Sequence, residues 1–134
     1  MTSQRPRILC VDDEPQNLKL LEATLTPKGY EVITAANGQD ALDRVCRQNI
    51  DLTLLDIMMP GMSGYEVCRK IKDDERLRNI TVVMITGLRS REDRIRGIES
   101  GAEDFISKPF DQAEVLARIK MLLEIKKRAE IMAK

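Results

Sequence analysis

ILCVDD, residues 8–13, is a short apolar run that ends in two aspartates. Such a run is typical of a strand that is buried on both faces of a parallel sheet. Three later apolar runs also end in polar side chains, which are Asp56, Thr86 and Lys108, the last followed by Pro109. Because parallel strands bring their carboxyl ends to one edge of a sheet, we expect these groups to share a crevice. Three carboxylates, a hydroxyl and an ammonium suit a divalent cation and a phosphoryl group.

Apolar runs alternate with amphipathic segments along the whole chain, which predicts a (βα)5 domain. The expected strands are residues 7–11, 31–35, 52–55, 81–85 and 104–106, and the expected helices include residues 15–25, 38–47, 91–99 and 112–134. Helix starts are indicated by N-cap residues or capping boxes at Asn37, Ser63 with Glu66, Ser90, and Asp111 with Glu114. The pattern predicts a parallel sheet covered by helices on both faces, with right-handed crossovers.

Composition bounds the class of protein. The chain has 134 residues, enough for one domain, and its 22 basic and 22 acidic residues give no net charge. This balance and the 3% aromatic content argue against nucleic acid or a membrane surface as a partner. No segment has the pattern of a signal peptide or a membrane span. The absence of histidine argues against zinc, and we expect Cys10, Cys46 and Cys68 to be buried thiols of a cytoplasmic protein.

The last predicted helix is longer than a domain of this size needs. Residues 112–134 contain no helix breaker and would span about 34 Å. Its first half has a broad apolar face, and Leu122, Ile125, Ala129 and Met132 continue as a narrower seam. We expect a main domain over residues 6–123 and a helical extension or linker over residues 124–134. A fraying tail and a dimer helix fit the seam equally well, and the uncapped end suggests that more chain follows.

Each polar strand end also has an ordinary structural explanation when it is taken alone. Asp12 and Asp13 could cap a helix, and Thr86 is a common strand residue. Carboxylates placed together repel one another unless a cation lies among them, and Mg²⁺ accepts such oxygen ligands. Asp56 is the candidate nucleophile toward phosphorus, and Lys108 could neutralise phosphoryl charge. Pro109 restricts the backbone of that lysine and permits a cis bond.

The ordered set Asp12-Asp13, Asp56 with the following Met59-Pro60-Gly61, Thr86 and Lys108-Pro109 resembles the receiver domain of bacterial response regulators. The resemblance covers nearly the whole chain. It implies a flavodoxin-like, doubly wound fold with strand order 2-1-3-4-5. It also implies a phosphoprotein of a two-component phosphorelay rather than a conventional enzyme, and the stretch from Asp93 to Ala102 is most similar to receivers found with cyclic-dinucleotide output domains.

The resemblance implies a role for each site residue. A histidine kinase or phosphotransfer protein would phosphorylate Asp56. Mg²⁺ or Mn²⁺ would be held by Asp13, Asp56 and the backbone carbonyl of Met58, with Asp12 acting directly or through water. Thr86 and Lys108 would then bind the phosphoryl oxygens.

A switch would carry the signal outward. The resemblance implies that Thr86 moves toward the phosphoryl group and that Phe105 turns inward. The output face would comprise the helix over residues 91–99, the strand over residues 104–106 and the last helix. The apolar Met58 and Leu88 stand where other members often carry polar groups, so we expect them to lengthen the life of the phosphoryl state.

Two other classes of function are compatible with an aspartate at this position. A stand-alone Mg²⁺-dependent phosphatase or phosphotransferase needs a substrate pocket and an acid or base beside Asp56, which the sequence does not indicate. An interaction module that works without phosphorylation would not need the complete set of site residues. A homodimer, through the output face or the last helix, and an effector domain outside this chain remain expected partners.

Overall fold

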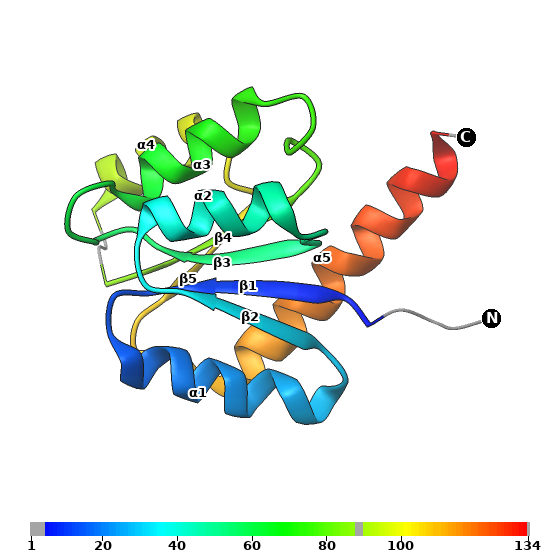
Figure 1. The fold of residues 1–134 in the computed structure, drawn as a ribbon, viewed down its shortest axis with the longest axis horizontal. Coiled ribbons are helices and arrows are strands. Elements are labelled where there is room, and N and C mark those ends of the chain that lie inside the picture. Colours follow the sequence, from blue (N-terminus) through cyan, green and yellow to red (C-terminus); the bar gives the residue numbers. More distant parts are fainter. Residues whose placement is uncertain (1–4, 88–89, 134) are drawn as a thin grey trace.

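The chain folds around one five-stranded parallel sheet (Figure 1). The computed structural model describes residues 5–87 and 90–133. The strands are β1 (Arg7–Val11), β2 (Glu31–Ala35), β3 (Leu52–Asp56), β4 (Thr81–Thr86) and β5 (Asp104–Ser107), in the order β2-β1-β3-β4-β5. The predicted flavodoxin-like order is therefore confirmed. Three strands run one residue further than predicted, because Asp56, Thr86 and Ser107 still pair in the ladder.

Helices cover both faces of the sheet, as the sequence predicts. They are α1 (Pro15–Leu25), α2 (Gly38–Arg47), α3 (Gly64–Asp73), α4 (Arg91–Ser100) and α5 (Gln112–Met132), with a short 3-10 helix, η1 (Thr26–Lys28), after α1. In Figure 1, α2, α3 and α4 lie on one side of the sheet, and α1 and α5 on the other. Each side encloses its own apolar cluster. Among the described residues, no helix has the length and apolar character to cross a bilayer.

The central strands are apolar because both of their faces are covered. Every residue of β3 and β4 is buried, so neither strand shows the alternation of a half-exposed sheet. One polar atom in this core is unsatisfied: Thr53 Oγ1 is buried without a hydrogen-bond partner among the described residues. The loops at the carboxyl edge of the sheet therefore start from strands that are buried on both faces.

All four predicted helix starts are confirmed. At three of them the N-cap side chain accepts a hydrogen bond from the third residue of its helix: Asn37 from Asp40, Ser63 from Glu66, and Ser90 from Asp93. At Asp111 the helix begins as predicted, but the predicted capping box does not form. Asp111 accepts from the Ala113 amide at 3.0 Å, and Glu114 instead pairs with Arg118 at 3.2 Å. An arginine one turn along the helix competes successfully for the glutamate.

The prediction that all three cysteines are buried is wrong for one of them. Cys10 and Cys68 are buried, but Cys46 is exposed on α2. The helix buries Ala41 and Val45, and the next residue is rotated by about 100° away from that side. A broad apolar face in the sequence therefore overestimates the strip that contacts the sheet.

Helix α5 changes its surroundings along its length. Val115, Ile119 and Leu122 are buried against the sheet, whereas Ile125 and Met132 are exposed. Figure 1 shows the end of the helix extending away from the strands. In this part, Lys126 Nζ donates a hydrogen bond of 2.5 Å to the Asn79 carbonyl.

Candidate functional site

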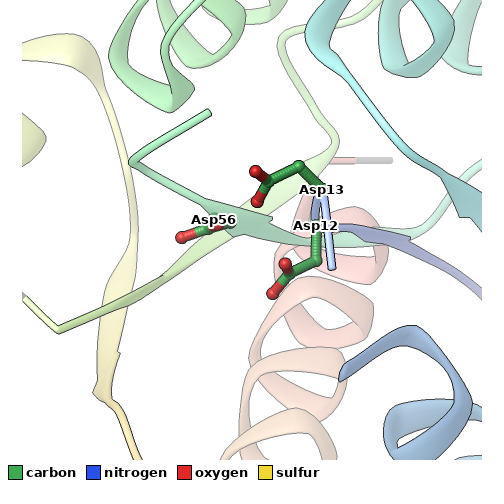
Figure 2. Close-up of side chains that lie close together, drawn as sticks. All are labelled: Asp12, Asp13 and Asp56. Atoms are coloured by element: carbon green, nitrogen blue, oxygen red, sulfur yellow. The ribbon is translucent and has the colours of Figure 1, made fainter. Parts of the chain in front are cut away.

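Three carboxylates lie together at the carboxyl edge of the sheet. Asp12 and Asp13 follow β1, and Asp56 is the last residue of β3. The strands are hydrogen-bonded neighbours, with Val11 paired to Leu55, so their ends meet. One carboxylate oxygen from each aspartate lies within 4.8 Å of the others (Figure 2). Asp12 and Asp56 are buried and Asp13 is exposed, so the cluster has one open side.

Lys108 brings a positive charge into this cluster. Its Nζ lies 3.2 Å from Asp12 Oδ2 and 3.3 Å from Asp56 Oδ1. The lysine follows β5, and its backbone amide donates to the Thr86 carbonyl at 2.8 Å. The bond between Lys108 and Pro109 is cis, an arrangement that the sequence permits. One ammonium thus bridges carboxylates from two different strands.

Asp12 is held in place by groups that the sequence analysis missed. Asn17 Nδ2 donates to Asp12 Oδ2 at 3.1 Å, and the Glu14 amide donates to Asp12 Oδ1 at 2.9 Å. Asn17 lies in α1, with its side chain directed back to the loop after β1. Asp12 and Asn17 are five residues apart across a helix start, and this spacing matches no common capping motif. The contact between them is therefore seen only in the structure.

The electrostatics of the cluster disfavour a fully ionised state. Burial raises the pKa of Asp56 to about 6, an increase that the Lys108 ammonium opposes and that Asp12 and Asp13 reinforce. Burial alone would lower the pKa of Lys108, but the charges of Asp56 and Asp12 outweigh it and raise that pKa. A cation at the open side would relieve the remaining repulsion. The oxygen donors present suit Mg²⁺, which binds through a few carboxylates and retains water.

The loop after Asp56 is fixed by a glycine at the start of α3. The Gly64 amide donates to the Ile57 carbonyl at 2.9 Å. A β-carbon on Gly64 would collide with the backbone carbonyl of Asp56, so only glycine permits this approach. Met58, the second residue after Asp56, is 65% exposed. The loop is therefore held at its start by β3 and at its end by Gly64, and it presents an apolar side chain to solvent beside Asp56.

Thr86 and Phe105 occupy the last two strands of the site edge. Thr86 is buried at the end of β4, and Phe105 is partly buried and packs against the cluster beneath α2, α3 and α4. The Phe105 ring lies so close to Gly97 of α4 that a β-carbon there would collide with it. Gly97 is not among the residues predicted from the sequence, although a glycine inside a helix is a signal of close packing. Leu88 lies outside the described residues.

Comparison with known proteins identifies the family. The family model for the response regulator receiver domain matches residues 8–120. The chain belongs to the response regulator receiver family. The domain is 53% identical over 120 residues to response regulator PleD of Caulobacter vibrioides. The aligned residues cover 90% of this chain and 26% of that protein. It is also 41% identical to the DNA-binding dual master transcriptional regulator RpaA of Synechocystis, covering 88% of this chain and 49% of RpaA.

Solved receiver structures have the same fold. A CheY-like receiver domain protein from Methanospirillum hungatei superposes with a TM-score of 0.89 at 30% identity, covering 94% of this chain and 99% of that one. Chemotaxis protein CheY4 of Vibrio cholerae gives a TM-score of 0.84 at 29% identity, covering 88% and 98%. The resemblance found in the sequence is thus confirmed in sequence and in structure.

Membership of the family defines the general function. Receivers are the regulatory, phosphorylated domains of two-component systems, so this receiver is a phosphorylation-activated switch. Its acidic cluster is the kind of pocket in which receivers bind Mg²⁺. None of the comparisons favours a stand-alone phosphatase or a phosphorylation-independent module. The receiver spans about a quarter of PleD and about half of RpaA.

Proposed function

We propose that Asp56 is the phosphoacceptor of this receiver, with a histidine kinase or a phosphotransfer protein as donor. The supporting observation is the bridge of Lys108 between Asp56 and Asp12, which places an ammonium beside the carboxylate that would become phosphorylated. An Asp56 oxygen forms the new bond to phosphorus while the bond from phosphorus to the donor's nitrogen breaks. The proton that restores a neutral imidazole nitrogen comes from solvent.

Asp13, Asp56 and the backbone carbonyl of Met58 would hold Mg²⁺ or Mn²⁺, and Asp12 would act directly or through water. This donor set supports the proposal because Asp13, the exposed member, gives a hydrated ion access to the two buried aspartates. When bound, the cation offsets negative charge on the phosphoryl oxygens. Asn17 and the Glu14 amide keep Asp12 oriented toward the cluster.

Lys108 and Thr86 would bind the phosphoryl oxygens. Lys108 now donates to two carboxylates, so it must give up at least part of that interaction to reach a phosphoryl oxygen. The two arrangements therefore differ in contacts made by the same side chain, which is the condition for a switch. Phe105 would turn inward as Thr86 moves, and the change would appear on the face formed by α4, β5 and α5.

The receiver would occupy residues 6–123, and residues 124–134 would form the extension or linker. The change from a buried to an exposed apolar face along α5 supports this division. Dimerisation would use either the α4–β5–α5 face, where Ile95 and Ile98 are exposed, or the end of α5. An effector outside this chain, of the cyclic-dinucleotide class, would respond. We place the receiver in the cytoplasm, where it contacts neither nucleic acid nor membrane directly.

Phosphate labelling tests this proposal. Purified receiver is incubated with radiolabelled acetyl phosphate with and without Mg²⁺, beside Asp56→Ala and the exposed matched control Asp43→Ala. We expect stable, stoichiometric, Mg²⁺-dependent labelling that Asp56→Ala abolishes and Asp43→Ala retains. Rapid release of phosphate at many turnovers would instead indicate a phosphatase, and absence of labelling would indicate a module without this chemistry.

A further inference from the structure

Helix α4 is attached firmly at its C-terminal end. The Cys68 thiol of α3 donates to the Ser100 carbonyl at 3.3 Å, and both residues are buried. Just beyond the helix, Glu103 accepts a hydrogen bond of 2.7 Å from Lys72 Nζ. The Lys72 side chain also packs against Gly101, which ends α4 in a left-handed conformation. Two side chains of α3, Cys68 and Lys72, therefore hold this end of α4.

Nearer to the N-terminus of α4, the side chain of Tyr65 in α3 makes two contacts with that helix. Its hydroxyl donates a hydrogen bond of 3.0 Å to the backbone carbonyl of Asp93, in the first turn of α4. The guanidinium carbon of Arg96 lies 4.2 Å from the centre of the Tyr65 ring, a cation–π contact. The buried Tyr65 side chain thus contacts α4 through its hydroxyl group and through the face of its ring.

Tyr65 also stands beside the proposed phosphorylation site. It follows Gly64, the residue whose backbone packs on the carbonyl of Asp56. Glu66, its other neighbour, closes the capping box that begins α3. A shift of the loop after Asp56 would therefore reach Tyr65 through Gly64, the residue to which it is directly bonded.

We propose that Tyr65 is a positioning residue that latches residues 93–96 of α4 in the arrangement seen in this structure. The inference rests on the proposed function, because it concerns how that site controls the output face. The latch contributes to the switch only if the phosphoryl state weakens it, since contacts equal in both states shift no equilibrium. Loss of the latch would then make the phosphoryl state easier to reach.

The test compares Tyr65→Phe, which removes only the hydroxyl, with Arg96→Gln, which removes the cation. Tyr30→Phe and Arg94→Gln are matched controls, since Tyr30 lies near β2 on the side of α1 and α5 and Arg94 is exposed on α4. The affinity of each protein for beryllofluoride in the presence of Mg²⁺ is measured by calorimetry. Amide hydrogen exchange along α4 is measured without ligand.

We expect Tyr65→Phe and Arg96→Gln each to bind beryllofluoride about two- to fivefold more tightly than wild type, the effect of one modest contact. Exchange should rise in the first turns of α4 and stay unchanged near Ser100. Unchanged or weaker binding by both variants, with wild-type binding intact, would overturn the latch alone. Failure of wild type to bind beryllofluoride with Mg²⁺ would overturn the proposed function, and the latch with it.

Discussion

A lysine ammonium lies among oxygen atoms at each of the two edges of the sheet, but the balance of charge around the two lysines differs. At the amino edge, Lys72 Nζ donates to the Ile80 carbonyl at 2.6 Å and to Glu103 Oε2 at 2.7 Å, and the Val82 amide fills the other oxygen of that glutamate at 2.7 Å. At the carboxyl edge, the Lys108 ammonium contacts Asp12 and Asp56, two of the three carboxylates of the cluster.

The difference assigns the two edges to different tasks. A pair of opposite charges with all its hydrogen bonds made fixes the geometry of the chain around it. A cluster with an excess of negative charge is left open to a cation and to covalent change. The receiver therefore has the Lys72 clamp and the proposed phosphorylation site at opposite edges of its sheet.

The largest effect is expected from breaking the clamp. Lys72→Met should lower the free energy of unfolding by about 2 kcal/mol, because Glu103 Oε2 and two backbone carbonyls lose the ammonium that donates to them. Urea denaturation measures the change, with the exposed Lys70→Met as matched control. A loss no greater than that of the control would show that water replaces the ammonium and that the clamp contributes little.

The opposite sign is expected at the carboxyl edge. The folded chain binds a proton on Asp56 more tightly than the unfolded chain, with a pKa of about 6 instead of 3.8. Its contribution to stability is therefore present below pH 3.8 and lost as the pH rises through 6. Without divalent cations, Asp56→Asn should be more stable than wild type above pH 6 by about 1 to 2 kcal/mol, a value discounted for solvent screening.

This advantage should disappear near pH 4, and Mg²⁺ should reduce it at neutral pH by stabilising wild type. Thermal melts of both proteins across this pH range, with and without the cation, measure both effects. Asp43→Asn serves as the exposed carboxylate control. A pH-independent difference between wild type and Asp56→Asn would contradict the raised pKa.

A smaller effect is expected between the two edges, at the centre of β3. Thr53→Val should raise the free energy of unfolding by about 1 kcal/mol, because it replaces a buried hydroxyl that lacks a partner among the described residues with a methyl group of similar size. Chemical denaturation measures this change. The control Thr81→Val alters a buried strand threonine nearer the amino edge. Destabilisation by Thr53→Val would mean that the hydroxyl has a partner after all.

The smallest free-energy effect concerns the lifetime of the phosphoryl state. Met58→Asn, and Leu88→Glu in the segment outside the described residues, should each speed loss of the phosphoryl group about three- to tenfold, equivalent to about 1 kcal/mol in the barrier. A polar group at either position would orient an attacking water. Decay of radiolabelled receiver measures the rates, with Met121→Asn as an exposed methionine control. Unchanged or slower decay would contradict the role of these side chains.

Part of the fold and of the candidate site can be predicted from the sequence alone. The boundaries of α1 and α2 follow from periodicity and local breakers such as Pro27, and the structure has them as predicted. The four polar strand ends could be placed together because adjacency in a parallel sheet follows from the strand order. The sequence did not predict that Cys46 is exposed, because the apolar face of α2 is broader than the strip that contacts the sheet. It also did not predict that Glu114 pairs with Arg118, because Arg118 and the N-cap backbone are both within reach of that carboxylate.

The sequence by itself determined the alternation of strands and helices and the types of side chain at the carboxyl edge, because both depend on neighbours along the chain. Tertiary structure alone decided what those side chains touch. The contacts that matter most join separate elements: Asn17 to Asp12, Gly64 to Asp56, Gly97 to Phe105, and Tyr65 of α3 to Asp93 of α4. Such contacts depend on distances of a few ångströms across the fold, and short-range patterns in a sequence do not encode them.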